Sequence, residues 1–358
     1  MVATSDMLAQ VTATRRAPVR VGIAGLSHGH VNWVFQRSQP DGIEIVGFAE
    51  ADQRIAERYR ERYGIDQHLL FDNLETMLAV TQPTAVMAFG SIYDHCAVVE
   101  ACAPRGIHVM VEKPLAVSVD HAVTMAALAR QHQIHLLTNY ETTWYASNHT
   151  AYQMACTEQR LGALWKVVVH DGHWGPQEIG CPPEFLAWLT DPVLNGGGAL
   201  IDFGCYGANL MTWFMGGAAP LTVTAVTQQM KPAIYPQVED EATVILTYPQ
   251  AQCVIQASWN WPYHRKDLEI YGQTGYLHAV DRQTIRLRES PQSQEQTITL
   301  PPQPAPLTDP FAYLAAVVRG DVTVADTDLS ALANNLTVVR ILDAARTAAH
   351  QGKTVTLA

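Results

Sequence analysis

A lysine between a glutamate and a proline is the first group in the sequence whose type and position suit catalysis. Glu112-Lys113-Pro114 follows the apolar run His108–Val111, at the carboxyl end of an expected strand, where parallel sheets place their ligands. An ammonium group beside a hydroxyl stabilises the alkoxide that precedes loss of a hydride. Taken alone, the tripeptide is better explained as a surface ion pair in a turn set by Pro114.

A second segment combines an acid with a phenol. The glycines at 196–198 lead into an expected helix that carries Asp202 and Tyr206, and residues four apart share one helix face. Tyr206 would accept or donate the proton of a reacting hydroxyl, and Asp202 would orient a neighbouring hydroxyl or Lys113. The alternative is that Tyr206 is a core aromatic residue and Asp202 a helix cap, which are the commoner roles of these residues taken separately.

A degenerate glycine-rich turn follows the first expected strand. Gly25-Leu-Ser27-His28-Gly-His30 occupies the place of a dinucleotide-binding turn, with Ser27 and His30 at the second and third glycine positions. The Ser27 hydroxyl and the amides at the following helix N-terminus would hold a pyrophosphate. The turn alone is weak evidence for a nucleotide site.

An acid at the end of the second expected strand favours one cofactor. Glu50 would accept hydrogen bonds from both ribose hydroxyls and repel a 2′-phosphate, so we expect NAD. NADP stays open, because Arg54 lies one helical turn later and would accept a phosphate if the loop shifts. A solvated helix start is the structural alternative for Glu50.

The elements that must position these groups alternate regularly in the first part of the chain. From Val19 to about Asn139, β-rich runs alternate with amphipathic stretches, which is typical of a parallel sheet with crossover helices. Helices are expected from Asp52 to Tyr63 and after Ser118. The expected strands are Val19–Ala24, Glu44–Ala49, Leu69–Phe71, Ala85–Phe89, His108–Val111 and Ile134–Thr138.

After Tyr140 longer strands follow one another with few helices between them, which favours a mixed or antiparallel sheet. These strands are Trp165–His170, Leu221–Thr227, Ala242–Tyr248 and Cys253–Ala257. We therefore expect a disordered tail at 1–18, an α/β domain with a parallel doubly wound sheet at 19–142, and an α+β substrate-binding and oligomerisation domain at 143–358. The helix at 329–350 would pack back on the first domain.

These segments, in this order, resemble the Gfo/Idh/MocA family of oxidoreductases. The resemblance runs from about Arg20 to the last expected strand, and it rests on the turn at 25–30, Glu50, His95, Glu112-Lys113-Pro114 and the run from Gly196 to Tyr206. It implies a Rossmann domain, a second domain with a large open sheet, NAD or NADP as cofactor, and sugars, polyols or related substrates. Many members carry histidine in place of Tyr206, and the tyrosine resembles the glucose–fructose oxidoreductase and dihydrodiol dehydrogenase branch.

The residues and the resemblance together give an expected site. Catalysis falls to Lys113, Asp202 and Tyr206. The cofactor would contact Gly25, Ser27, His28, His30, Glu50, His95, Glu112 and Lys113, and the substrate would contact Lys113, Asn139, Tyr140, Trp174, Asp202 and Tyr206. No metal is expected, because no carboxylate or thiol is spaced along the chain to complete a shell with the histidines.

The expected activity is hydride transfer between a nicotinamide and a hydroxyl or carbonyl carbon. One alternative keeps a bound NAD for transient oxidation, as in a glycosidase or epimerase without net redox change. The other is a regulator that senses NAD(P) without catalysis, against which the intact set of Lys113, Asp202 and Tyr206 argues.

Composition limits the partners and the compartment. With 358 residues the chain is long enough for two domains. A net charge of −11 without a cluster of cations argues against nucleic acid, and no apolar run is long enough to span a membrane. The six scattered cysteines are typical of reduced thiols, so we expect a cytoplasmic protein that acts on a small molecule, as a homodimer or homotetramer.

Overall fold

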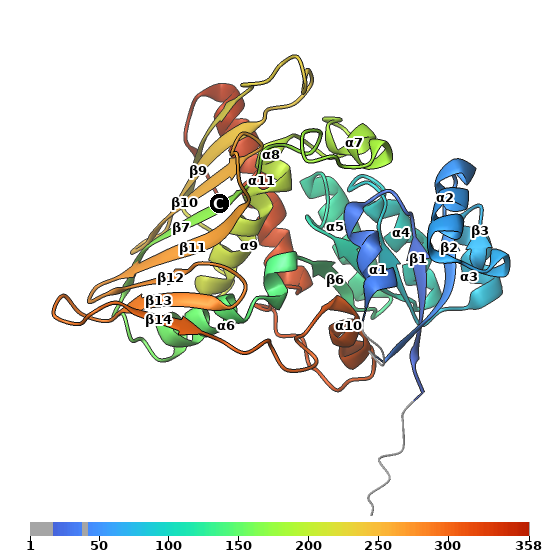
Figure 1. The fold of residues 1–358 in the computed structure, drawn as a ribbon, viewed down its shortest axis with the longest axis horizontal. Helices are drawn as coiled ribbons and strands as arrows, with labels where there is room; N and C mark the ends of the chain where they lie inside the picture. The colour runs from blue at the N-terminus through green and yellow to red at the C-terminus, as the bar shows by residue number, and fades with distance from the viewer. Residues whose placement is uncertain (1–16, 38–41, 358) are drawn as a thin grey trace, which may run out of the picture.

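The computed structural model describes residues 17–37 and 42–357. Each of its two domains is built on one β-sheet (Figure 1). Residues 1–16 of the expected tail lie outside the described residues. In the described part of the chain, no helix combines the length and apolarity needed to cross a membrane.

The first sheet is parallel, and its six strands have the order β3-β2-β1-β4-β5-β6. The strands are β1 (Val19–Ala24), β2 (Ile43–Ala49), β3 (Leu70–Phe71), β4 (Ala85–Ala88), β5 (His108–Glu112) and β6 (Leu136–Asn139). The expected strands are confirmed to within two residues at each end. The strand order reverses between β1 and β4, and a sheet of this kind binds its ligands at the carboxyl ends beside such a reversal.

Helices cover both faces of this sheet. They are α1 (Asn32–Gln36), α2 (Gln53–Tyr63), α3 (Leu74–Thr81), α4 (His95–Cys102), α5 (Val119–Gln131) and the late helix α10 (Pro310–Val318). The expected helix ends are confirmed: Gly64 ends α2 with φ 67°, and the Ser118 side chain caps α5. Strand residues that alternate in sequence enter separate cores, Val86 and Val109 on one face and Met87 and Met110 on the other.

The second sheet is mixed, with nine strands in the order β14-β13-β12-β11-β7-β10-β9-β8-β15. They are β7 (Leu164–Gly172), β8 (Thr222–Gln228), β9 (Glu241–Thr247), β10 (Gln252–Ser258), β11 (Arg265–Gly272), β12 (Tyr276–Ala279), β13 (Thr284–Arg288), β14 (Gln296–Thr299) and β15 (Val355–Thr356). Only β7 and β10 pair in parallel. The expected fold class, a parallel α/β domain followed by a domain with a large mixed sheet, is confirmed.

One face of the second sheet packs on helices and the other is uncovered (Figure 1). Helices α9 (Gly204–Phe214) and α11 (Leu332–Gln351) lie on the packed face, where Val167 and Val169 of β7 join the core. α11 also contacts α5 and β6 of the first sheet, so it links the two domains.

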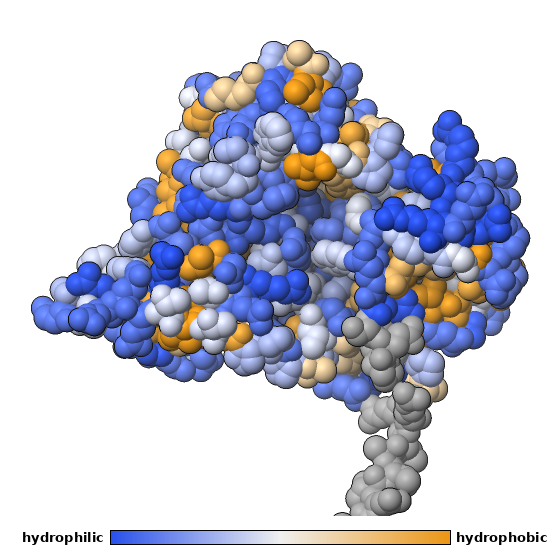
Figure 2. Space-filling view, viewed as in Figure 1, coloured by the Kyte–Doolittle hydropathy of each residue, from blue (hydrophilic) through white to orange (hydrophobic). Residues whose placement is uncertain are grey.

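Two short helices lie between the domains. Helix α7 (Pro183–Leu189) lies over the first domain, and α8 (Ala199–Asp202) leads into α9 (Figure 1). The molecular surface is hollowed between the two domains (Figure 2). The carboxyl ends of β5 and β6 and the start of α9 meet in this region, and the residues expected to act in catalysis come from these ends.

Candidate active site

A buried ion pair joins the two domains. Lys113, which follows β5, donates through Nζ to the Asp202 carboxylate and, at 2.9 Å, to the Asp202 carbonyl oxygen. The Trp259 indole N–H donates to the other carboxylate oxygen at 3.0 Å. The side chains of Lys113 and Asp202 are only 6% and 8% exposed. The structure therefore brings together two residues that are 89 positions apart in the sequence.

Pairing keeps both groups charged in spite of their burial. Burial lowers the pKa of Lys113, but the Asp202 carboxylate outweighs it and the pKa lies above its usual value. Burial likewise raises the pKa of Asp202, and the Lys113 ammonium outweighs it, so this pKa lies below its usual value. The site thus holds a fixed positive charge at Lys113, and opposite charges at this distance favour the ionised forms.

The expectation of one continuous helix through Asp202 and Tyr206 is wrong. Helix α8 ends at Asp202, and α9 begins at Gly204. The Asp202 carbonyl accepts from Lys113, and the Tyr206 N–H, which an unbroken helix would pair with that carbonyl, donates to the Phe203 carbonyl instead. The Lys113 ammonium thus occupies the Asp202 carbonyl that would otherwise accept a helical hydrogen bond. The spacing of side chains in the sequence does not reveal this competition for the carbonyl.

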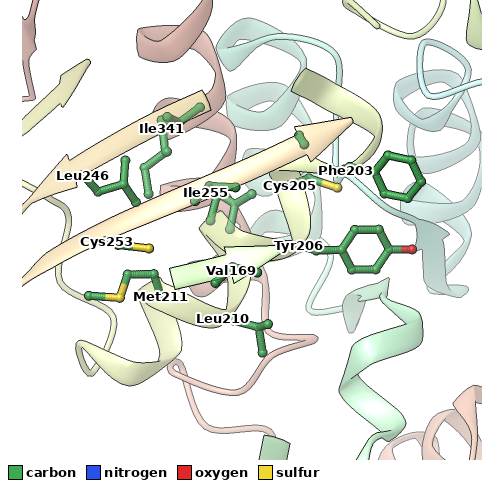
Figure 3. Close-up of a cluster of buried hydrophobic side chains, with 14 of the residues drawn as sticks. Val169, Phe203, Cys205, Tyr206, Leu210, Met211, Leu246, Cys253, Ile255 and Ile341 are labelled. Carbon is green, nitrogen blue, oxygen red and sulfur yellow. The ribbon is translucent and has the colours of Figure 1, made fainter. Parts of the chain in front are cut away.

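Tyr206 places a phenol at the edge of the core. Figure 3 shows its ring at the end of the buried cluster, with the hydroxyl directed away from the apolar side chains. Lys113 Nζ lies 5.4 Å and Lys266 Nζ 4.3 Å from the ring centroid, and Tyr140 contacts the ring edge-on. Burial raises the pKa of Tyr206 well above its usual value. The phenol is therefore protonated at neutral pH.

Three ionisable groups of the site, on Lys266, Glu141 and Asp171, were not expected from the sequence. Lys266 lies near the start of β11, on the face of the sheet that packs on helices. Its ammonium pairs with the Glu141 carboxylate at 2.5 Å. Asp171 lies opposite Lys266 in the β7–β11 register, and its Oδ1 is buried without a hydrogen-bond partner among the described residues. Burial raises the pKa of Asp171 well above its usual value. In the sequence, Lys266 and Asp171 are visible only as polar residues at the ends of strands. The register of β7 with β11 brings them together beside Tyr206.

The turn after β1 fits a dinucleotide. Gly25 has φ 80°, and a Cβ there would lie 2.7 Å from the Gly90 amide nitrogen, so only glycine fits. A Cβ at Gly29 would meet open space. Glu50 accepts from the Leu26 and Asp52 amides at 2.8 and 2.9 Å, which fixes its carboxylate beside the turn. An anionic phosphate on the turn and ribose hydroxyls on Glu50 match these donors and acceptors.

His28 and His30 of this turn form a cluster with Glu112, the last residue of β5. Their ligand atoms all lie within 4.8 Å of one another, so the structure corrects the expectation that no carboxylate accompanies these histidines. Glu112 Oε2 is 3.0 Å from His30 Nδ1, and the Asn139 amide donates to Oε1 at 2.7 Å. Burial alone would raise the pKa of Glu112, but the two imidazoles and these hydrogen bonds lower it to about 2.

Hydrogen bonding at His28 decides what this cluster offers. Burial holds the pKa of His28 well below its usual value, so the ring is neutral. Its Nδ1 accepts from the His30 amide at 3.0 Å, which leaves the proton on Nε2, the atom that faces Glu112 at 3.9 Å. A ring in this state offers a donor and not the lone pair that a metal needs. That the chain holds no resident metal stays a prediction.

Of the remaining expected residues, Asn139, Tyr140 and His95 are buried near the site, and Trp174 is exposed. Asn139 and Tyr140 are buried at the end of β6. The Asn139 amide donates to Glu112, and the Tyr140 ring contacts the Tyr206 ring. His95 is fully buried, and its Nδ1 lies 3.1 Å from the Leu115 carbonyl, so it supports the turn after Lys113. Trp174 is 56% exposed and has no described contact with the group around Lys113.

Helix α7 covers the turn after β1. Phe185 and Trp188 pack on the His28 ring at centroid distances of 5.1 and 5.6 Å, and Glu184 forms an ion pair with Arg58 of α2. His28 is consequently only 2% exposed. The second domain therefore contributes one wall of the region beside the turn.

Two family models match consecutive parts of the chain. Residues 19–140 match an oxidoreductase family with an NAD-binding Rossmann fold, and residues 149–278 match the GFO/IDH/MocA C-terminal domain. Together these ranges include the residues placed in the site above except Glu141, which lies between them.

Individual relatives are distant. A trans-1,2-dihydrobenzene-1,2-diol dehydrogenase of Sus scrofa is 27% identical over 58% of this chain and 57% of its own length, so the match spans little more than half of that protein. A D-xylose 1-dehydrogenase (NADP(+)) of Haloferax volcanii is 24% identical over 94% of this chain and 99% of its own length. An inositol dehydrogenase homolog from Azotobacter vinelandii, solved with NAD+, shares the fold with a TM-score of 0.81 at 18% identity, covering 95% of this chain and 98% of that one.

Proposed function

The chain belongs to the Gfo/Idh/MocA family of oxidoreductases, and on that premise we propose that it transfers a hydride between a nicotinamide cofactor and a CH–OH group of a sugar or polyol. One observation carries the proposal. The charged Lys113–Asp202 pair and the protonated Tyr206 phenol converge beside the turn that fits a dinucleotide. A fixed positive charge and a proton donor are what reduction of a carbonyl requires from a protein.

The cofactor would lie on the turn after β1. The Gly25 turn and the N–H groups near Gly29 would hold the pyrophosphate, and Glu50 would accept the ribose hydroxyls. Bound there, a nicotinamide supplies the hydride acceptor or donor. Glu50 opposes a 2′-phosphate, so NAD is the proposed cofactor.

Each catalytic residue would have a separate part in the proton and charge balance. In the reducing direction the Tyr206 phenol donates its proton to the developing alkoxide oxygen, and the Lys113 ammonium stabilises the negative charge on that oxygen. In the oxidising direction the Tyr206 phenol first releases its own proton to solvent, and the phenolate then takes the hydroxyl proton; because burial raises the pKa of Tyr206 well above its usual value, this direction is favoured by alkaline pH. Asp202 holds Lys113 in place.

Cofactor titration is the first test of this proposal. NADH and NADPH are added to the purified chain, and binding is followed by fluorescence. We expect tighter binding of NADH, and Glu50→Ala should reduce that preference because it removes the carboxylate that repels a 2′-phosphate. Absence of binding by either nucleotide would contradict the proposal at its first step.

Turnover is tested separately with aldoses and polyols in the presence of NAD. Tyr206→Phe retains the ring and removes the phenol, and we expect kcat to fall by about 10²- to 10⁴-fold, the usual contribution of a general acid or base. Lys113→Ala removes the ammonium that stabilises the alkoxide and should lower kcat as well; its matched control is Lys353→Ala, at an exposed lysine. Accumulation of NADH distinguishes net oxidation from redox-neutral chemistry, in which no NADH accumulates.

Association and location form a further part of the proposal. We propose that copies of the chain associate through the uncovered face of the second sheet. A cytoplasmic location is supported by the six cysteines, which are all free thiols, as in a reducing compartment. The net charge of −11 supports a small-molecule partner over nucleic acid.

A further inference from the structure

A cavity of about 320 Å³ lies beside the reaction centre. Its walls come from α1, from the turn Glu141–Trp144 after β6, from the loop that carries Arg282, and from the start of α10. In Figure 1 α10 lies below α1 in the first domain. Lys113, Asp202 and Tyr206 do not line the cavity, so it is a space additional to the site described above.

One residue connects the cavity to the catalytic group. Glu141 lines the cavity and also pairs with Lys266 at 2.5 Å. Lys266 in turn lies 4.3 Å from the centroid of the Tyr206 ring. A substrate that reacts at Tyr206 and extends along the Lys266–Glu141 pair would therefore reach the cavity.

The lining combines flat apolar surfaces with balanced polar groups. Trp33, which is half-buried, supplies an indole ring to the cavity, and the buried rings of Trp144 and Phe311 lie behind the lining. Aromatic rings of this kind pack against the apolar faces of sugar rings. Trp33 and Trp144 are both held in place: His30 stacks on Trp33 at 3.9 Å between centroids, and the Trp144 N–H donates to Asn139 at 3.0 Å.

The charges of the lining favour a neutral occupant. The formal charges of Glu141 and Asp309 equal in number those of Arg37 and Arg282; Glu141 is paired with Lys266, and Asp309 caps α10. Gln36 adds an amide with both donors and an acceptor. This mixture suits hydroxyl groups, which donate and accept, better than it suits a phosphate or a carboxylate.

We propose that this cavity is a subsite for a second, non-reacting ring of the substrate. The substrate class is then a disaccharide or another glycoside, whose reacting sugar lies at Lys113 and Tyr206 and whose second ring lies against Trp33. The volume is at the small end of the ~300–1,000 Å³ typical of ligand sites, which suits one ring and is too small for a dinucleotide. This inference rests on the proposed oxidoreductase function.

The test compares the specificity of the native chain with that of a variant whose cavity is filled. Rates of NADH formation are measured for a panel of hexoses and pentoses and for disaccharides that contain them. Gln36→Trp, at an exposed residue of the cavity rim, inserts a large ring into the space. Gln131→Trp is the matched control, because Gln131 is exposed and is also the last residue of its helix.

For the native chain we expect at least one disaccharide to have a kcat/KM about tenfold above that of its reacting monosaccharide, since buried aromatic contacts are worth about that factor. Gln36→Trp should bring this ratio to about one, and Gln131→Trp should leave it unchanged. Oxidation of monosaccharides without any advantage for disaccharides would overturn the subsite and leave the proposed function standing. An advantage that persists in Gln36→Trp would also overturn it. No sugar-dependent NADH with any member of the panel would overturn both proposals.

Discussion

At the scale of single residues, the site is defined by how its buried charges are paired. Lys113 pairs with Asp202 and Lys266 with Glu141, because a buried charge without a partner is strongly unfavourable. Asp171 is not fully paired: its Oδ1 is buried without a hydrogen-bond partner in the described part of the chain, and burial raises the pKa of the carboxyl well above its usual value. A neutral carboxyl in this position is able to donate a hydrogen bond to a substrate hydroxyl.

The Lys113–Asp202 pair gives the first prediction. Lys113→Met leaves the Asp202 carboxylate buried without its counterion, and we expect the free energy of unfolding to fall by ~3–5 kcal/mol. The double variant Lys113→Met/Asp202→Asn removes the charge and retains an acceptor for Trp259, so it should recover most of the loss. Urea denaturation measures both. Equal destabilisation of the single and double variants would show that the pair contributes no charge coupling.

The second prediction concerns acid stability. Burial lowers the pKa of His95 to about 4, so the unfolded chain, whose histidines titrate near 6.5, binds this proton first as the pH falls. The contribution of His95 to the free energy of unfolding is therefore fully present above pH 6.5. It is about 3 kcal/mol and is lost as the pH falls from 6.5 to 4. His95→Asn retains a donor towards Leu115 and cannot take up the proton. We expect it to flatten this part of the stability profile in urea denaturation.

The exposed His350 provides the control for this measurement. His350→Asn should leave the profile between pH 6.5 and 4 as it is in the native chain. If His95→Asn also leaves the profile unchanged, the burial of His95 does not determine the acid stability.

Sequence reasoning identified the ion-pair residues but not their neighbours. Lys113, Asp202 and Tyr206 stand in motifs, and a motif is local in the sequence. Lys266 and Asp171 become neighbours only through the register of β7 with β11. The residues of β7 and β11 do not indicate which strand each pairs with. The proximity of Lys266 and Asp171 was therefore not predictable from one sequence.

At the scale of elements, the strands were predictable and the helix break was not. The runs of β1 and β5 are apolar on both faces because helices cover both sides of the first sheet. The break between α8 and α9 depends on Lys113, which is far away in the sequence and takes the Asp202 carbonyl. Local patterns therefore predict an element well when local packing decides it, and poorly when a distant side chain does.

The third prediction tests how α9 is placed on the sheet. A Cβ at Gly207 would lie 2.7 Å from Cγ2 of Ile255 in β10, so Gly207→Ala forces the helix or the isoleucine to move. We expect a loss of stability of ~1–3 kcal/mol together with a lower kcat, because Tyr206 is the preceding residue. Adding Ile255→Ala to this variant should restore kcat. Thermal denaturation and turnover rates measure the two effects.

A second glycine of α9 offers the comparison. A Cβ at Gly204 would lie 3.4 Å from Leu200 Cδ1, which is ordinary contact, so Gly204→Ala should leave stability at or above that of the native chain. If Gly207→Ala is equally well tolerated, close approach of α9 to β10 is not required for the site.

At the scale of the whole molecule, the two sheets differ in how they are covered. The first is enclosed by helices, and the second leaves one face open (Figure 1). On that open face Val254 pairs with Val168 on one side and with Ile245 on the other. All three side chains are only half-buried, and together they form an apolar row at the middle of the face. Such a row favours an interface with a second copy of the chain.

The last prediction tests this interface. We expect light scattering coupled to size-exclusion chromatography to give the native chain the mass of a dimer or tetramer. In a two-fold interface each substitution occurs on both partners, so Ile245→Lys would bring two unpaired charges into the apolar row and should lower the mass to that of a smaller species. Val123→Lys, at a valine that is 51% exposed on α5, should keep the native mass. A native chain that is monomeric, or an Ile245→Lys variant that keeps the native mass, would show that the copies do not associate through this face.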